Sequence, residues 1–426
     1  MQCILLSETL SVELTGSHMS DFKQYPVVAN GTSVKSLFWA QQQQSGQPAC
    51  LVHTRSVEDV AAVISVSRTT SCPFAVRGGG HSDIQGASNI NGGITVNMAG
   101  LSDVEFDESE GLVRVGAGAT WGEVYEELEK INKTVVGGRL TGVGVGGLLL
   151  GGGLSHFSGL HGWACDNVRN YEVTTLKLDD RRSLMAIQVV LANGSLTIAS
   201  ESSNSDLYHA MRGGGNSFGV VTRFDLDVFQ QGPMWGGLHV WPLLPSVTSA
   251  LTRGFVKFAH DAPSDPYVSL FAGLGYKQGN FAWAAGQYDT LGRVEPSIFT
   301  QFKDDAEVYG TAKIVSTARV TSVSDLADEL NQSEPAGMRS RFTTATFTAD
   351  VGLLALMVDI FVEQVQKALD NGLQEDQRFA PMLGIQPLTQ NLLKAQATRG
   401  GNVMGLHDDE APLVGECCHA FFFVWR

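Results

Sequence analysis

The chain has 426 residues, more than one ordinary hydrophobic core accommodates, so its length predicts two domains. Apolar residues make up 43% and charged residues 17%, the proportions of a folded globular protein rather than a disordered one. The formal net charge of −15 argues against nucleic-acid binding, and no apolar run reaches the roughly 20 residues that span a bilayer. We therefore expect a folded protein with no nucleic-acid or membrane partner.

The first half of the chain alternates short strands, helices and glycine turns. Residues 1–44 are polar and irregular and form an N-terminal extension. A short strand and a helix capped near Ser56 follow, and "PFAVRG" predicts a strand that enters a glycine loop. Further strands are expected in "GGITVNMAGL" and "GLVRVGAGAT", and a helix with Thr120 as its N-cap. The strand "KTVVGG" then leads into residues 137–153, of which nine are glycine.

The pattern of expected strands and helices changes near residue 232. Turn residues in "QQGPMWGG" indicate a boundary between residues 45–232 and 233–426. Beyond it, strands such as "YVSLFAGLGY" alternate with helices such as "GLLALMVDIFVEQVQKALDNG". This pattern predicts an α+β domain with an antiparallel sheet covered by helices on one face.

Targeting and cysteine signals are weak. The N-terminus lacks the basic start and apolar core of a signal peptide, and the six cysteines include no C-x-x-C motif. The spacing predicts neither a disulfide framework nor a zinc site, and it favours an intracellular protein without settling the compartment.

The stretch "RGGGHS" places three glycines before His81 at the end of a strand. Consecutive glycines allow backbone N–H groups to surround a phosphate, which would make the loop an anion-binding nest. The alternative is a tight turn beside a buried histidine, and this motif alone favours that alternative.

Three other patterns suggest chemistry that their context disfavours. Gly142–Gly147 matches the dinucleotide fingerprint, with Asp166 about 20 residues later, but a second glycine cluster would interrupt the helix that the fingerprint requires. "GNSFG" around Ser217 matches the nucleophile elbow of hydrolases, but the second domain lacks repeated βα units. His156 and His161 are five residues apart, not four, so a metal site is not expected.

Together, these segments resemble one protein family. "PFAVRGGGHSDIQGAS", "VRVGAGATWGEVYEEL", "VVGGRLTGVGVGGLLLGGGLSHFSGLHGWACDNV" and "LYHAMRGGGNSFGVVTRFDL" resemble the PCMH-type FAD-binding domain of berberine-bridge-enzyme-like flavoproteins, in their fungal branch. This family belongs to the vanillyl-alcohol-oxidase superfamily. The resemblance covers about residues 45–232 and continues more weakly to "GGNVMGL" at 400–406. It implies an FAD domain of two α+β subdomains, followed by an α+β substrate domain.

The resemblance also implies a set of cofactor-binding residues. His81 matches the histidine that bonds covalently to the flavin 8α-methyl, a linkage that makes the flavin a stronger oxidant. The positions implied to line the FAD are Arg77, Gly78, Gly79, Gly80, Ser82, Gly142, Val143, Gly146, Gly147, Gly151, Gly152, Gly153, Trp163, Asp166, Asn167, Val220 and Val221.

The sequence departs from the family pattern at the position of a second covalent link. Many members tether the flavin again through a cysteine, but Leu140 occupies that position here and Leu148 replaces a nearby histidine. We therefore expect a single covalent bond through His81 and a site less suited to large sugars. Val143 resembles the residue that controls access of oxygen to the flavin, and its modest size is compatible with an oxidase.

Two segments do not follow the family. Residues 173–188 interrupt the expected strand "NYE-VVLANGS", and either a surface hairpin or a retained short intron accounts for them equally well; sequencing of the transcript distinguishes the two. The chain ends at "HAFFFVWR", where the family continues with segments that close the FAD domain, so the resemblance predicts a truncated substrate domain. Phe421–Trp425 is expected to be a core strand.

The resemblance implies an FAD-dependent oxidase of a small, largely apolar metabolite, with hydride transfer to flavin N5 and O2 as the acceptor. The catalytic base is not identified, and Tyr267, Tyr276 and Tyr288 are candidates by residue type only. A flavin-scaffolded cyclase or dehydratase and a non-catalytic remnant remain as alternatives.

Overall fold

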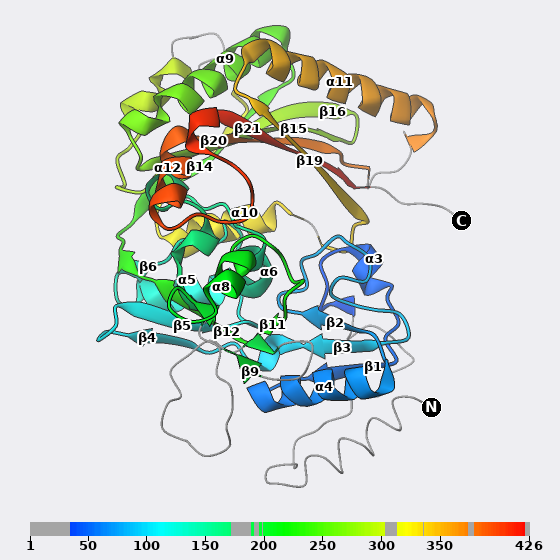
Figure 1. Cartoon of the computed structure of the whole chain (residues 1–426). Helices are drawn as coiled ribbons and strands as arrows, with labels where there is room; N and C mark the ends of the chain where they lie inside the picture. The colour runs from blue at the N-terminus through cyan, green and yellow to red at the C-terminus, as the bar shows by residue number, and fades with distance from the viewer. Residues whose placement is uncertain are drawn as a thin grey trace.

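The computed structural model describes residues 35–171, 189–190, 196–197, 199–302, 313–334, 336–373 and 379–421. In Figure 1 the first half of the chain forms the lower part of the molecule, and one large sheet with its helices forms the upper part. The expected α+β class is thus confirmed. The insertion at 173–188 and the residues after Phe421 lie outside the described residues.

A three-stranded parallel sheet begins the fold. Its strands are β1 (Cys50–His53), β3 (Ile94–Asn97) and β2 (Phe74–Arg77), in that order. The predicted helix is α4 (Val57–Thr70), and it starts where the Ser56 side chain and Asp59 form a capping box. It ends at Ser71, which adopts the left-handed conformation.

A five-stranded antiparallel sheet follows, in the order β10-β7-β12-β5-β4. Its strands are β4 (Val104–Asp107), β5 (Leu112–Gly116), β7 (Val168–Tyr171), β10 (Ala199–Ser200) and β12 (Arg223–Asp227). The smaller pairings involve β6 (Lys133–Thr134) with β13 (Phe229–Gln230), and β11 (Val220–Val221) with β8 (Val189–Val190), which also pairs β9 (Leu196–Thr197).

The helices of this part are short. They are α3 (Gln41–Gln44), α5 (Trp121–Glu129), α6 (Val145–Leu150), α7 (Ser158–His161) and α8 (Ser205–Met211), with one-turn helices η2 (Met98–Gly100) and η3 (Ala164–Asn167). Thr120 caps α5 as predicted, through a capping box with Glu123. The strand expected in "KTVVGG" is shorter than predicted, because only Lys133 and Thr134 pair and the following valines are buried in the core.

The second part is built on an eight-stranded sheet in the order β17-β14-β16-β15-β20-β21-β19, with β18 also paired to β14. Its strands are β14 (Met234–Pro242), β15 (Val268–Lys277), β16 (Asn280–Asp289), β17 (Val315–Ser316), β18 (Arg319–Thr321), β19 (Ser340–Thr348), β20 (Met382–Leu388) and β21 (Leu413–Phe421). All the pairings are antiparallel, as the alternation of the sequence predicts.

Helices cover one face of this sheet. Figure 1 shows α9 (Pro245–Asp261) and α11 (Val351–Asp370) above the strands, while the opposite face looks toward the first part of the chain. The remaining helices are α10 (Val323–Gln332) and α12 (Gln390–Thr398), with the short 3₁₀ segments η4 (Ala262–Ser264), η5 (Ser297–Phe302) and η8 (Asp408–Glu410). None of the helices in the described ranges is long and apolar enough to cross a membrane.

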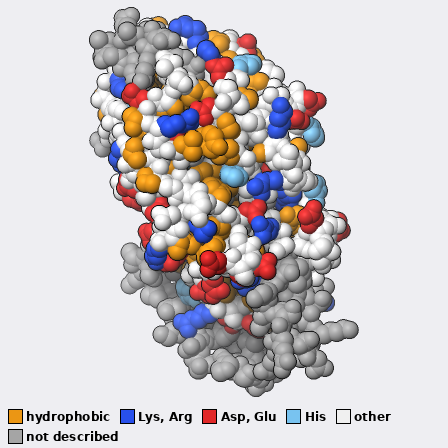
Figure 2. All heavy atoms as spheres, turned by 90° about the vertical axis from the view of Figure 1, so that its left-hand side faces the viewer, with side chains coloured by type: hydrophobic (Ala, Val, Ile, Leu, Met, Phe, Trp, Pro, Cys, Tyr) orange, Lys and Arg blue, Asp and Glu red, His pale blue; other side chains and the backbone are white. Residues whose placement is uncertain are grey.

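One hydrophobic core crosses from the first part to the second. Buried residues of α5 and α6 share a cluster with Leu326 and Leu330 of α10 and with Tyr288 of β16. Helix α10 is also tied to the first part by Glu129, whose carboxylate accepts hydrogen bonds from the Ser324 backbone and hydroxyl. On the face shown in Figure 2, acidic, basic and hydrophobic side chains intermingle. The shared core and the Glu129 hydrogen bonds thus join the two parts of the chain.

Candidate functional site

The loop that follows β2 presents a row of free backbone donors. The N–H groups of Gly78, Gly79, Gly80 and Ser82 donate to no described residue. Backbone N–H groups without partners are costly unless a ligand or water accepts from them. The loop therefore has the donor set of the anion nest expected from the sequence.

His81 is half-buried at the end of this loop and stacks on Trp39. The two ring centroids are 4.5 Å apart, and the planes differ by 13°. Burial lowers the pKa of His81 below its usual value of 6.5, so the imidazole is neutral at physiological pH. A neutral, fixed imidazole has the lone pair that a nucleophile requires.

Residues 35–44 hold the histidine loop in place. The Gln42 amide donates to the carbonyls of Asp83 and Ser340, and Gln43 accepts from the Asn89 backbone. The carboxylate of Asp83 in turn accepts from the Phe342 backbone on β19. Part of the polar extension expected from the sequence therefore connects the histidine loop to the large sheet.

Arg77 faces protein groups. Its Nε donates to the Leu37 carbonyl, and Nη1 donates to Asn97 Oδ1 at 2.9 Å. Ser82 caps the following turn, since its hydroxyl accepts from the Ile84 backbone. Both side chains shape the loop, while the loop backbone carries the free donors.

The two glycine segments cross each other at Gly79 and Gly144. A Cβ atom on Gly79 would lie 2.4 Å from the Gly144 nitrogen, and one on Gly144 would lie 2.3 Å from the Gly79 nitrogen. Any larger residue at either position would force the backbones apart. This contact brings the loop that carries His81 against the segment that begins α6.

Around α6 the remaining glycines have two different environments. Gly147 is exposed, and a Cβ there would meet nothing within 4 Å. Gly151 ends α6, whereas Gly152 and Gly153 have positive φ angles of 105° and 84°. The glycine cluster thus ends the helix after six residues, as the argument against a dinucleotide fingerprint required, and leaves an open backbone surface at Gly147.

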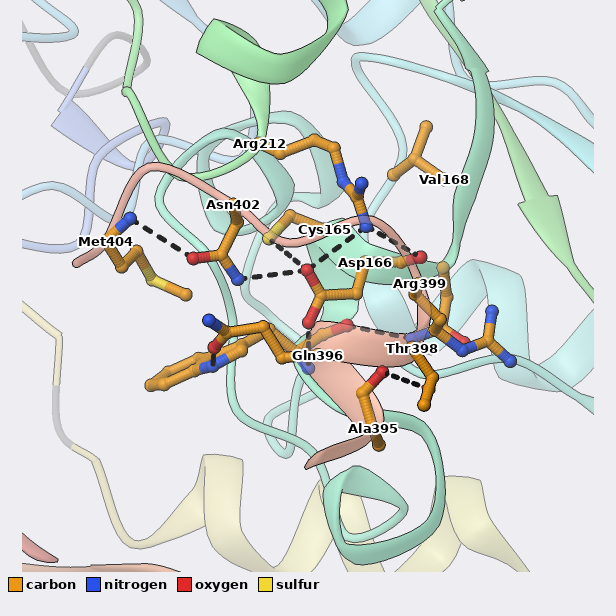
Figure 3. Close-up of polar contacts among 12 residues, drawn as sticks. Cys165, Asp166, Val168, Arg212, Ala395, Gln396, Thr398, Arg399, Asn402 and Met404 are labelled. Carbon is orange, nitrogen blue, oxygen red and sulfur yellow. Dashed lines mark hydrogen bonds and ion pairs between the residues drawn. The ribbon is translucent and has the colours of Figure 1, made fainter. Parts of the chain in front are cut away.

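Asp166 is the centre of a buried polar network (Figure 3). Its carboxylate pairs with Arg212 at 3.3 Å and accepts from Asn402 Nδ2 and the Trp163 backbone, both at 2.9 Å. The carboxylate is fully buried and occupied by protein donors, unlike the accessible acid that a dinucleotide fingerprint needs. The network joins the 163–167 segment to the loop after α12.

The same loop supplies a side chain that packs on two glycines. Met404 lies so close to Gly152 and Gly213 that a Cβ on either glycine would come within 2.7 Å of its side chain. Both glycines have positive φ angles. Gln396 fixes the loop by accepting from Trp163 Nε1 and donating to the Leu406 carbonyl.

The other predicted cofactor residues lie around these loops. The Asn167 amide donates to two carbonyls, while its Oδ1 is buried with no partner among the described residues. Val143 is half-buried, and its carbonyl accepts from the Trp121 backbone; Gly142 donates to Asn331. Gly146 is buried against Ala117, and Val220 and Val221 form β11.

The structure separates the three candidate tyrosines. Tyr267 is exposed, and the Tyr276 hydroxyl accepts from Gly279 at the tip of a hairpin. Tyr288 alone of the three is buried on the sheet face that looks toward the glycine loops, where its ring lies over Gly236. Burial raises the pKa of Tyr288, so it is a protonated hydrogen-bond donor at neutral pH rather than a preformed base.

The hydrolase and metal hypotheses find no support in the described residues. Ser217 lies exposed in the turn between α8 and β11, and no histidine of the described ranges bonds to it. His156 packs on Tyr288, and His161 stacks on Phe229. No group of three potential metal ligands occurs among the described residues.

Sequence reasoning missed Trp39, Arg139, Arg212 and Met404. Trp39 lies in a segment whose composition suggested an extension, and the others lie beside glycine motifs that dominate the local pattern. An aromatic residue within a polar stretch and a lone arginine between glycines were the available signals.

Comparison with known proteins places this geometry in a family. Residues 48–177 match the family described as FAD binding domain. The chain is 81% identical over 412 residues to FAD-dependent monooxygenase tpcD of Cochliobolus heterostrophus, covering 97% of this chain and 76% of the relative. It is 67% identical over 412 residues to FAD-dependent monooxygenase FUP4 of Fusarium proliferatum, covering 97% and 77%.

Solved structures share the fold at low sequence identity. Glucooligosaccharide oxidase from Acremonium strictum, described with a 6-S-cysteinyl, 8α-N1-histidyl FAD, matches with a TM-score of 0.73 at 17% identity, over 98% of this chain and 82% of that one. BBE-like 1 of Physcomitrella patens matches with a TM-score of 0.66 at 18% identity, over 93% and 81%. With two fungal FAD-dependent monooxygenases this similar over nearly the whole chain, the protein belongs to the berberine-bridge-enzyme-like family of FAD-dependent oxidoreductases.

Proposed function

We propose that this protein oxidises a small, largely apolar metabolite with an FAD that is bonded once, through His81, and with O2 as the acceptor. The observation that carries the proposal is the loop after β2, where free N–H donors flank a half-buried, neutral imidazole stacked on Trp39. Such a loop fits a pyrophosphate beside a histidine nucleophile.

The glycine segments fit the flat remainder of the cofactor. Gly147 offers exposed backbone with open space above it, and the Gly79–Gly144 contact fixes its distance from the histidine loop. Gly142, Gly146 and Gly151–Gly153 would continue this backbone surface, which we call the glycine bed. Val220 and Val221 would lie at its adenine end. Arg77, Trp163, Asp166 and Asn167 would act by holding these loops, since their polar groups mainly contact protein.

A single covalent bond follows from the residue at position 140. Leu140 is half-buried beside the core and has no sulfur that could bond to a flavin. Cys165 on η3 would not replace it, because its side chain is fully buried and burial raises the pKa of its thiol. FAD would supply a two-electron acceptor that O2 reoxidises, with hydrogen peroxide as the product.

The sheet face that looks toward the glycine loops would bind the substrate. Tyr288 and Phe271 lie flat on it, with ring centroids 6.0 Å apart. Tyr288, as a protonated phenol, would donate to a substrate oxygen and orient the carbon from which hydride leaves. The rings would exclude water from that carbon.

A monooxygenase is the second candidate, because both fungal relatives carry that name. The two reactions differ in the fate of O2. An oxidase releases about one H2O2 for each product, while a monooxygenase incorporates one atom of 18O2 into product. Turnover under 18O2 with peroxide quantified in parallel therefore separates them.

Acid precipitation tests the cofactor part of the proposal. The yellow colour should remain with the precipitated protein and should be released in His81→Ala. A flavin that stays unreduced during anaerobic turnover would favour the cyclase or dehydratase alternative. A folded, colourless protein would support the non-catalytic remnant and overturn the proposal.

A further inference from the structure

Arg139 reaches from the glycine segment to the large sheet. Its Nη1 donates to Gln386 Oε1 on β20 at 2.6 Å, and its guanidinium lies over the Phe271 ring at 5.0 Å. Gln386 is oriented in turn by its own donation to the Leu270 carbonyl. The cation is thus fixed at the boundary between the two parts of the molecule.

No carboxylate neutralises this cation among the described residues. Arg212 pairs with Asp166, and Arg319 pairs with Asp325 and Glu329, whereas Arg139, like Arg77, has only neutral partners. Arg139 has an amide and an aromatic ring instead, and its desolvation lowers its pKa. A desolvated cation without a counter-charge is costly, and an anionic ligand would relieve that cost.

The titratable groups around Arg139 add no negative charge. His156 is buried with its ring 4.0 Å from Tyr288, and burial together with Arg139 lowers its pKa to about 3, so it is neutral. Tyr288 remains a protonated phenol, because burial raises its pKa. The Glu329 carboxylate also raises the pKa of Tyr288, but this carboxylate is already paired with Arg319 and Thr317.

Small residues shape this face of the sheet. Cβ atoms on Gly236 and Gly286 would clash with the rings of Tyr288 and Phe271, so these glycines let the rings lie flat. Along β20, Met382, Gly384 and Gln386 keep solvent-accessible surface, whereas the alternate residues are buried under the helices. Arg139 is itself only half-buried, so a ligand can reach it.

We propose that Arg139, assisted by the Tyr288 hydroxyl, binds an oxyanion of the substrate, such as an ionised enol, phenol or carboxylate. This inference rests on the proposed function, because the proposed function places the substrate on the sheet face that looks toward the FAD. The guanidinium holds the charge, with one arm of its fork occupied by Gln386 and the others left for the ligand. The substrate class is then an apolar metabolite with one acidic oxygen.

Ligand binding to the purified holoprotein tests the inference. The probes are 4-nitrophenol at pH 8, where it is ionised, its neutral analogue 4-nitroanisole, and benzoate, each titrated by difference absorbance of the flavin. We expect 4-nitrophenolate to bind at least 10-fold more tightly than 4-nitroanisole. Comparable binding of benzoate would identify a carboxylate site, and weak binding of benzoate would identify an enol or phenol site.

The variants isolate the charge. Arg139→Met should weaken phenolate binding at least 10-fold and leave 4-nitroanisole unchanged, while Arg139→Lys should lose less because it keeps the charge. Tyr288→Phe should weaken phenolate binding about threefold to tenfold. Arg253→Met, which removes a cation from the exposed face of α9, is the matched control and should have no effect. Unchanged phenolate affinity in Arg139→Met overturns the inference. If Arg139→Met does not fold, unchanged phenolate affinity in both Arg139→Lys and Tyr288→Phe overturns it.

A second readout separates substrate from cofactor. Sulfite forms an adduct with flavins near a positive charge, so a loss of sulfite affinity in Arg139→Met with unchanged phenolate binding would assign Arg139 to the FAD and overturn the inference. Failure of the proposed function would be seen differently, as a colourless protein or a flavin that the substrate does not reduce. The two failures are therefore distinguishable.

Discussion

The indole of Trp39 lies parallel to the imidazole of His81, with 4.5 Å between the ring centroids. Trp39 belongs to a segment some 40 residues earlier in the chain, and its backbone N–H donates to the Gly80 carbonyl. The stack fixes the plane of the imidazole at the position from which it would attack the flavin. We therefore expect Trp39 to act as a positioning residue for the proposed covalent bond.

We expect Trp39→Leu to reduce covalent attachment of FAD by at least half, because the aliphatic side chain cannot hold the imidazole plane. Trp39→Phe keeps an aromatic face and should retain most of the attachment. The measurement is the fraction of flavin that stays with acid-precipitated protein, together with flavin fluorescence of the denatured band. Equal attachment in Trp39→Leu and the wild type would show that the stack has no such role.

Two glycine variants should separate folding from cofactor binding. Gly147→Ala meets open space and adds helix propensity, so the thermal midpoint of the FAD-free protein should not fall. Its FAD occupancy should fall several-fold, because the methyl group projects from the exposed backbone. Gly79→Ala meets the Gly144 backbone at 2.4 Å and should lower both the midpoint and the occupancy.

The control for these variants is Gly232→Ala, which also meets nothing within 4 Å but lies between the two parts of the chain. It should leave both measurements unchanged. Normal FAD occupancy in Gly147→Ala would contradict the glycine bed at that position.

The Asp166–Arg212 pair should matter strongly for stability. Asp166→Asn leaves the Arg212 charge buried without a counter-ion, and breaking such a pair costs about 3–5 kcal/mol of unfolding free energy. Asn402→Ala removes one hydrogen bond and should cost about 1 kcal/mol. Urea unfolding measures both, and the exposed pair Lys257–Asp261 on α9 provides the control, since Lys257→Ala should change little. A similar cost for all three variants would show that the buried pair is unimportant.

Stability should fall below pH 6.5 because His156 resists protonation. Burial lowers its pKa from the ordinary value of 6.5 to about 3 in the folded protein, so the unfolded chain binds more protons between these two values. The destabilisation is absent above pH 6.5 and grows as the pH falls; by pH 5 it amounts to about 2 kcal/mol from this histidine. His156→Asn should lack this part of the pH dependence when unfolding free energies at about pH 7.5 and pH 5 are compared. His161 and His239, whose pKa values are lowered to about 4, keep the remaining slope. An unchanged slope in the variant would contradict the assignment.

Local sequence was sufficient for many of the elements. The Ser56–Asp59 and Thr120–Glu123 pairs predict helix starts because a capping box involves residues three apart. Alternation in "YVSLFAGLGY" predicts a strand with one buried face, because successive side chains of a strand point to opposite faces. The glycine motifs in their order indicated the family, while the single covalent link inferred from Leu140 stays a prediction.

The partners of those motifs depended on the tertiary structure. Trp39, Arg139 and Met404 meet His81, Gln386 and Gly152 from distant parts of the chain, and no spacing rule connects such residues. Likewise, Tyr267, Tyr276 and Tyr288 are equivalent by type, and only the strand register places Tyr288 on the inward face. The sequence by itself determined where the glycine loops lie, because backbone conformation at glycine is a local property. Packing decided which side chains face those loops, because burial and charge compensation are set by contacts between segments far apart in the chain.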